Sequence, residues 1–106
     1  MSHESQPAIL VRPEDKGRQQ LKLAGDVTVF HAAELHQASL GLVQHDADVD
    51  VHCQEVQSID CAAIQVLLAL QEAMAGRGRA IRLLNPSAEL RETLVLAGLA
   101  GPLGVA

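Results

Sequence analysis

Apolar and polar residues alternate along short stretches of the chain, which is the pattern of β-strands with one buried face. The predicted strands are Ile9–Val11, Gln20–Ala24, Val49–Cys53 leading on to Ile59, and Ile81–Leu83. The Pro, Asp and Gly residues between Pro13 and Arg18 fit a hairpin connection, and Gly25 is predicted to end the second strand. Because polar residues alternate in strands two to four, one face of the sheet should meet water, with these polar residues on it: Lys22, Asp50, His52 and Arg82.

Between the strands, apolar positions recur every three to four residues, as in amphipathic helices. The predicted helices are Val29–Gln44, Cys61–Ala75 and Pro86–Ala97. Asp60 is the predicted N-cap of the second helix, because its carboxylate can accept hydrogen bonds from the first free N–H groups. Asn85 is predicted to cap the third, with Pro86 as its first residue, and Gly98 with Leu99 to end it in a left-handed cap.

Each predicted helix has an apolar stripe and a polar one. The predicted buried stripes are Ala32, Leu35, Ala38 and Leu42 in the first helix, Ala63, Val66, Leu67, Leu70 and Met74 in the second, and Leu90, Leu94 and Ala97 in the third. The exposed stripe of the first helix contains Glu34, Gln37, Gly41 and His45, and that of the second contains Ala62, Gln65, Ala69 and Glu72. The predicted fold is therefore a two-layer α/β domain, with a mixed four-stranded sheet and three helices on one face, in the order β-β-α-β-α-β-α.

Composition narrows the possible functions. The 106 residues suffice for one domain with an aliphatic core, predicted over residues 8–106 after a flexible tail of residues 1–7. A net charge of -5, with one Phe and no Trp or Tyr, argues against nucleic-acid binding. The sequence has no signal-peptide pattern and no apolar run long enough to span a membrane, so we expect a cytoplasmic protein with two reduced cysteines and no disulfide.

One segment, Ile59–Leu68 (IDCAAIQVLL), resembles the I-D-S/T-S/A-G-L-x-x-L-L segment of STAS domains, a family that includes bacterial anti-sigma factor antagonists and the cytoplasmic tails of sulphate transporters. Three further pieces agree in order. Leu23–Val27 is similar to the family's L-x-G-E/D-L/V, Arg77–Arg79 to its G-G/R turn, and Asn85–Leu99 to its closing helix. The resemblance covers roughly residues 8 to 105 and implies the STAS fold.

In many antagonists of this family a kinase phosphorylates a serine or threonine two residues after the Asp, and the corresponding residue here is Ala62. Phosphate acts as a switch by adding about two negative charges to a docking surface, and alanine has no atom that accepts it. The neighbouring Cys61 has no hydroxyl either, and Ser58 is interpreted as a loop residue before the cap. The resemblance therefore implies a STAS domain that lacks the phosphorylation switch.

We expect a non-enzymatic interaction module that docks through the start of the second helix. The predicted partner-binding residues are Asp26, Ser58, Asp60, Cys61, Ala62, Gln65, Ala69 and Glu72. Asp26 either caps the first helix, which is the preferred role, or joins this surface. The resemblance leaves three partner classes open: an anti-sigma factor or its kinase, a chemotaxis signalling complex, or the ATPase of a lipid-transport ABC system.

The alternative from another class is an enzyme with Cys61 as nucleophile, because aligned peptide dipoles at a helix start favour a thiolate. No histidine is placed as its base, so a small apolar role at a tight helix start is preferred. Cys53 is expected in the core. The five histidines lack metal-ligand spacing and the glycines match no nucleotide-binding loop, so neither a metal nor a cofactor is expected.

Overall fold

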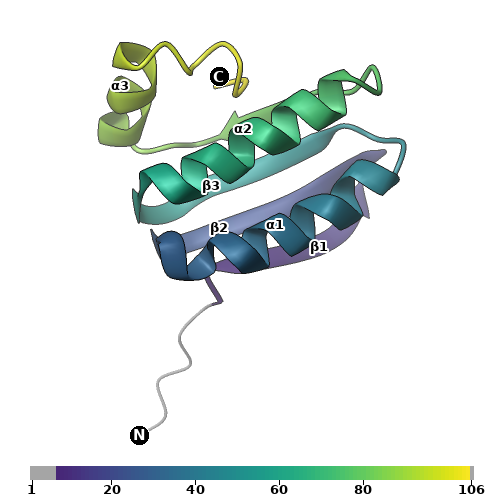
Figure 1. Cartoon of the computed structure of the whole chain (residues 1–106), viewed down its shortest axis with the longest axis horizontal. Helices are drawn as coiled ribbons and strands as arrows, with labels where there is room; N and C mark the ends of the chain where they lie inside the picture. Colours follow the sequence, from purple (N-terminus) through teal and green to yellow (C-terminus); the bar gives the residue numbers. More distant parts are fainter. Residues whose placement is uncertain (1–6, 106) are drawn as a thin grey trace, which may run out of the picture.

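The chain folds into a four-stranded sheet with helices over one face, and the computed structural model describes residues 7–105 (Figure 1). The elements are β1 (Ile9–Asp15), β2 (Arg18–Val27), α1 (Val29–Gln44), β3 (Val49–Ile59), α2 (Cys61–Ala75), β4 (Ile81–Leu84) and α3 (Ala88–Leu96). The strands lie in the order β1-β2-β3-β4, with β1 antiparallel to β2 and the other pairs parallel. This confirms the predicted fold. Of the predicted flexible tail, residues 1–6 lie outside the described part of the chain.

The first hairpin is tighter than the sequence suggested. Lys16 and Gly17 have φ angles of 53° and 76°, which is the backbone of a two-residue type I′ turn. Strand pairing therefore continues to Asp15 opposite Arg18, past an irregularity that begins after Arg12. As a result β1 extends four residues beyond the predicted end at Val11.

Gly25 does not end the second strand, so that prediction was wrong. It has a φ of 70° and lies where the register between β2 and β3 shifts, which is the geometry of a β-bulge. After the bulge β2 continues to Val27, because it pairs in parallel with β3 as far as Ile59.

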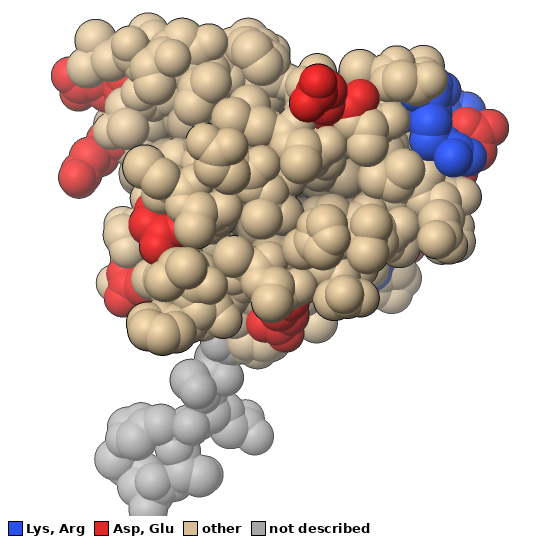
Figure 2. Space-filling model, in the orientation of Figure 1, with Lys and Arg blue, Asp and Glu red and all other residues tan. Residues whose placement is uncertain are grey.

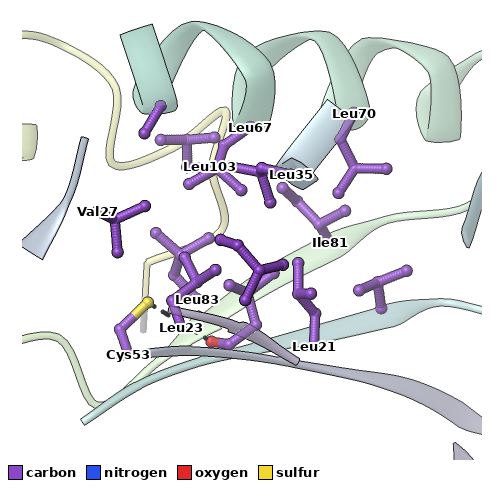
Figure 3. Close-up of a cluster of buried hydrophobic side chains, with 14 of the residues drawn as sticks. Leu21, Leu23, Val27, Leu35, Cys53, Leu67, Leu70, Ile81, Leu83 and Leu103 are labelled. Atoms are coloured by element: carbon purple, nitrogen blue, oxygen red, sulfur yellow. Dashed lines mark hydrogen bonds between the residues drawn. The ribbon is translucent and has the colours of Figure 1, made fainter. Parts of the chain in front are cut away.

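The core is aliphatic and lies between the sheet and the helices (Figure 3). The alternation of the strands places Leu21, Leu23 and Leu83 on the covered face. They meet Leu35 from α1 and side chains from α2, among them Leu67, Leu70 and Met74, all at most 2% exposed. Burying each such side chain contributes roughly 1.5 to 3 kcal/mol. The inward stripes of α1 and α2 are thus placed as their periodicity predicted.

The third helix begins later than predicted. Its N-cap is Ser87, whose Oγ accepts a hydrogen bond from Leu90 N at 3.0 Å, so Asn85 is not the cap and Pro86 is not helical. Instead Asn85 has a φ of 56° and Pro86 is buried. Pro86 is thereby used for packing rather than as a first helical residue.

The predicted end of α3 is confirmed. Gly98 has a φ of 74°, and Leu99 N donates to Leu94 O at 2.8 Å, which is the bond pattern of a Schellman cap. In the predicted buried stripe Leu94 is 1% exposed, but Ala97 is exposed because it lies in the cap itself.

The C-terminal segment covers the outer edge of β4. Leu83 N donates to Gly104 O at 3.1 Å, Leu83 forms a parallel bridge with Val105, and Leu103 is fully buried. Gly104 has a φ of 63°, and a Cβ atom there would lie 2.4 Å from the carbonyl oxygen of Ile81. Only glycine permits this close approach. One sheet edge is therefore covered, whereas within residues 7–105 β1 at the other edge pairs with β2 alone.

The open face of the sheet contains a network of charged residues centred on Asp50. Asp50 is 6% exposed, so the prediction that it faces water was wrong. It accepts hydrogen bonds from Arg18 Nε at 2.7 Å and from Arg82 Nε at 3.2 Å, and these side chains cover it. Burial raises the pKa of Asp50, but the hydrogen bond and charge of Arg18 and the charge of Arg82 more than offset this, so its pKa lies below the ordinary value.

Two further residues predicted on the open face, Lys22 and His52, also find partners within the chain. Lys22 forms an ion pair with Glu55, and the ring of His52 hydrogen-bonds to the side-chain oxygen of Gln20. Lys22 and His52 are half-buried, and only Arg82 of the four predicted residues is exposed. The open face is consequently polar, as predicted, and its central charges neutralise one another.

Candidate docking surface at the helix starts

Asp60 joins the starts of two helices. Its Oδ1 atom accepts a hydrogen bond from Ala63 N at 3.1 Å, which confirms that Asp60 caps α2. Its Oδ2 atom accepts from Val29 N at 2.7 Å, so the same carboxylate also binds the first residue of α1. Figure 1 shows both helices starting at the same end of the molecule, on the left of the view. One side chain therefore fixes the relative position of two helix N-termini.

Thr28, not Asp26, caps α1. The Oγ1 atom of Thr28 accepts from Phe30 N at 3.3 Å, and Thr28 N donates to Nδ1 of His31 at 3.1 Å, which completes a capping box. The preferred role of Asp26 was therefore wrong. The physical reason is that β2 continues to Val27 and leaves Asp26 inside the strand.

Asp26 instead pairs with Ser58 across two parallel strands. Ser58 Oγ donates to Asp26 Oδ1 at 2.6 Å, and the two residues are in register between β2 and β3. Ser58 therefore lies in a strand and not in a loop, contrary to the sequence-based interpretation. Both residues are exposed and lie near the ends of the strands that lead into the helices, and Ser58 is two residues before Asp60.

The most exposed large apolar side chain at this end of the molecule is one that the sequence analysis missed. Phe30, the second residue of α1, is 90% exposed, and the preceding Val29 is 58% exposed. Phe30 is also the single aromatic residue of the chain. A signal was present in the sequence, because Phe30 is four residues before Glu34 and therefore falls on the polar stripe of α1. Together with the adjacent Val29, Phe30 exposes apolar area at one helix start, and contiguous exposed apolar patches mark sites of contact with other molecules.

These residues define a helix-start surface. It consists of Asp26, Val29, Phe30, Ser58, Asp60, Cys61, Ala62 and Gln65. Ala62 is half-buried, whereas Cys61 and Gln65 are exposed. Beyond the surface, Ala69 and Glu72 continue the exposed stripe along α2, on the side opposite the buried Ala63, Leu67 and Leu70. The structure thus brings all the predicted partner-binding residues to this end or along one helix face, and adds Val29 and Phe30. Their role in binding remains a prediction.

Charge around this surface is mainly negative. Figure 2 shows the helix-covered face with Asp and Glu side chains spread along its borders. In the same view, Lys and Arg gather at the right-hand end, far from the helix starts. There Arg79 Nε is 2.8 Å from Asp46 Oδ1, in the region that follows the end of α2. A partner that approached the helix starts would therefore meet an apolar centre with acidic surroundings.

The two cysteines lie in different environments. Cys53 is 2% exposed in the core, where burial raises the pKa of its thiol to about 12, so it stays protonated at neutral pH. Cys61 is exposed as the first residue of α2. Within residues 7–105 no three His, Cys, Asp or Glu side chains gather as a metal site would require. None of the helices in that range is long and apolar enough to cross a membrane.

Similar folds occur among solved structures. An anti-sigma factor antagonist from Mycobacterium paratuberculosis is 19% identical and superposes with a TM-score of 0.75 over 99% of this chain and 89% of that one. A sulfate transporter family protein from Wolinella succinogenes is 20% identical, with a TM-score of 0.73 over 89% and 80%. The Bacillus cell fate determinant SpoIIAA in its phosphorylated form is 16% identical, with a TM-score of 0.73 over 93% and 91%. No curated protein matches the chain.

The fold shared with these structures agrees with the resemblance found in the sequence. A model of one family, described as "Mlab, STAS domain", matches residues 11–105, which is nearly the whole chain. The matched range begins within β1 and includes the other three strands, all three helices and the C-terminal segment on β4. The chain therefore belongs to the family of STAS domains.

Proposed function

We propose that this STAS domain is a regulatory, non-enzymatic module that docks on a partner protein through the helix-start surface. The observation that carries the proposal is Phe30, whose side chain is 90% exposed beside the two helix starts that Asp60 joins. Aromatic side chains are enriched among the residues that contribute most to protein–protein binding. An exposed phenylalanine on a rigid, doubly capped helix start is suited to insert into an apolar pocket of a partner.

The docking we propose is constitutive, without a phosphorylation switch. The position that carries the hydroxyl in many relatives is occupied by Ala62. Ser58 does have a hydroxyl, but it donates a hydrogen bond to Asp26, and a phosphate there would be repelled by this carboxylate. We therefore expect no stoichiometric phosphate on this surface in cells, which mass spectrometry of the purified protein would check.

The partner we propose is a protein of one of three classes. The sequence resemblance supports an anti-sigma factor or its kinase first, then a chemotaxis signalling complex or the ATPase of a lipid-transport ABC system. In each case the domain would act in the cytoplasm of a bacterium. Affinity purification at native expression level, with identification of the recovered protein, decides among the classes.

The variant that tests the docking surface is Phe30→Ser. We expect it to lose the recovered partner while the unfolding free energy stays within about 0.5 kcal/mol of the parent, because an exposed side chain contributes little to folding. The matched control is Leu96→Ser on α3, since Leu96 is 80% exposed and lies outside the helix-start surface. Equal recovery of the partner by Phe30→Ser and the parent protein would show that docking uses another surface.

The rival function is an enzyme that uses Cys61 as a nucleophile. The thiol of Cys61 is exposed, whereas that of Cys53 is buried and protonated. If the non-enzymatic proposal is correct, iodoacetamide should label Cys61 at the slow rate of an ordinary thiol near neutral pH. Labelling that is orders of magnitude faster would instead support an activated nucleophile.

A further inference from the structure

The two edges of the sheet differ in whether another segment of the chain covers them. The outer edge of β4 is covered by the C-terminal segment, through the bond between Leu83 N and Gly104 O. The outer edge of β1 has no such cover within residues 7–105, and β1 pairs with β2 alone. Uncovered edge strands with apolar residues are sites of association with another strand.

The hydrogen-bond phase of β1 identifies which backbone groups point outward. Ala24 N donates to Ala8 O, and Leu10 is paired with Lys22, so Ala8, Leu10 and Arg12 direct their backbone groups toward β2. In an antiparallel pair the alternate residues direct theirs away. The N–H and C=O groups of Ile9 and Val11 therefore face outward.

Proline limits this open stretch on both sides. Pro7 precedes it and Pro13 follows it, and neither residue has an N–H group to donate. Pro13 is in the outward phase, so its missing N–H removes no bond to β2. Residues 9–12 are thus the segment of β1 that is able to pair with another strand.

Apolar side chains accompany the free backbone groups. Leu10 is 40% exposed on the open face of the sheet, and Val11 is 50% exposed on the helix side. Beside Val11 a hollow runs between β1 and the later turns of α1, with Ala38, Gly41 and Leu42 in its lining. A Cβ atom on Gly41 would meet nothing within 4 Å, although glycine inside a helix is less stable than alanine by about 1 kcal/mol. The glycine is thus not required for packing within this chain, and it leaves the backbone of α1 open to a close approach.

We propose that this edge binds a second copy of the same chain, with two β1 strands paired antiparallel about a two-fold axis through Leu10. In that register Ile9 lies opposite Val11 of the other copy, so the outward N–H and C=O groups of both residues form four hydrogen bonds across the axis. Leu10 then meets Leu10 of the other copy. The result is one continuous eight-stranded sheet with the helix-start surfaces of both copies uncovered.

Charge and symmetry favour a second copy over an unrelated strand. A residue on a two-fold axis contacts the same residue of the other copy. Two leucines can pack together there, whereas two like charges would repel each other. The charged side chains near the edge also balance approximately: Arg12, Lys16 and Arg18 against Glu14 and Asp15. Two copies can therefore approach through β1 without the repulsion expected from a net charge of -5 per chain.

The test is the mass of the full chain in solution, measured by sedimentation equilibrium over a range of concentrations. We expect a monomer–dimer equilibrium in the parent, weakened about tenfold or more by Val11→Pro. This variant removes an outward N–H at each half of the interface while the bonds to β2 remain. Leu10→Lys should weaken the dimer similarly, by placing two like charges on the axis. The matched control Leu96→Lys, on α3, should leave the equilibrium unchanged, and circular dichroism checks that all variants fold.

Three outcomes would overturn the proposal. The first is a parent that remains monomeric up to about 100 μM, a concentration at which a dimer with a micromolar dissociation constant would be almost fully formed. The second is a dimer that is weakened by Leu96→Lys but not by Val11→Pro. The third is that the amides of Ile9 and Val11 exchange with solvent equally fast at high and low concentration. Binding of the Phe30-dependent partner is a separate readout, since no residue of the helix-start surface belongs to β1. Failure of one proposal would therefore not be mistaken for failure of the other.

Discussion

The open face of the sheet and the helix-start surface both face outward in the described part of the chain, and they differ in whether their side chains find partners within it. On the open face of the sheet, Asp50 is held by Arg18 and Arg82, and Lys22 by Glu55. On the helix-start surface, an aromatic side chain remains 90% exposed to water. The first surface neutralises its own charges, whereas the second presents apolar area that no other residue within 7–105 covers.

The comparison separates residues that serve folding from those that remain available for binding. A face with paired central charges gains little by contacting another protein, because those pairs would have to be desolvated. An exposed phenylalanine gains from burial wherever it finds a pocket. Substitutions on the open face should therefore change stability, and substitutions at the helix starts should change binding, with Asp60 contributing to both.

The largest effect on stability is expected for Asp50→Ala. It leaves the half-buried guanidinium of Arg18 without its closest acceptor, and we expect the unfolding free energy at pH 7 to fall by about 3 kcal/mol. Urea denaturation measures it. The matched control is Arg82→Gln, which removes one exposed partner and should lower the free energy by about 1 kcal/mol. Equal and small effects of the two variants would mean that the network contributes nothing to folding.

The same aspartate should make part of the stability dependent on pH. Because the folded-state pKa of Asp50 is below its ordinary value, its ionised form stabilises the folded protein. That contribution is complete above the unfolded-state pKa of about 3.9 and is lost as the pH falls through the lower folded-state pKa. The difference in unfolding free energy between the parent and Asp50→Ala should thus be constant from pH 7 to 5 and shrink below pH 4. A difference that grew on acidification would contradict this assignment.

An intermediate effect is expected for Asp60→Ala, which tests the link between the two helix starts. The variant leaves the N–H groups of Ala63 and Val29 without their acceptor, and we expect a loss of about 2 kcal/mol, more than for an ordinary N-cap. Asp60→Asn keeps one oxygen acceptor and should lose about half as much. Faster amide exchange at Val29 in the alanine variant would show directly that α1 is released, and unchanged exchange there would refute the link.

The sequence predicted the elements where the signal is local. The three-to-four-residue spacing gave α1 its observed limits, Val29–Gln44, and Asp60 was identified as a cap because the helix follows it directly. Alternation placed Leu21 and Leu23 in the core for the same reason. Each of these predictions depends on neighbours within a few residues of the chain.

Predictions failed where contacts distant in sequence decided the outcome. Asn85 and Ser87 are both able to cap a helix, and the burial of Pro86, set by tertiary packing, selects Ser87. Asp26 lies within a strand because β3 pairs alongside it. Asp50 is covered by arginines from two other strands, and alternation alone does not reveal such cover.

The candidate site was predicted in part. The resemblance indicated Ala62 and the outer stripe of α2. The contribution of α1 depends on two helices that start at the same end of the parallel strands β2 and β3. Phe30 was missed because the exposed stripe of its helix was assigned only from Glu34 onward. A large apolar residue on the polar stripe was the available signal.

The smallest effect on stability, with a large effect on binding, is expected for Ala62→Asp. Position 62 is half-buried at the start of α2, where the helix dipole favours a negative charge by about 0.3 to 1 kcal/mol. We therefore expect the unfolding free energy to change by less than about 1 kcal/mol in either direction. Against a bound partner, however, an unpaired carboxylate at this position would be buried, which costs several times more than the helix gains.

The measurement for Ala62→Asp pairs thermal denaturation with the affinity for the recovered partner. The control is Ala69→Asp, which places the same charge on the same stripe about two turns farther along α2, where Ala69 is exposed and the dipole no longer acts. Affinity should fall much more for position 62 than for position 69. If Ala62→Asp unfolds the domain, the buried part of the side chain at position 62 is needed for packing within the domain. If both variants bind as well as the parent, the partner contacts neither α2 nor its start, and Phe30 must act with another surface.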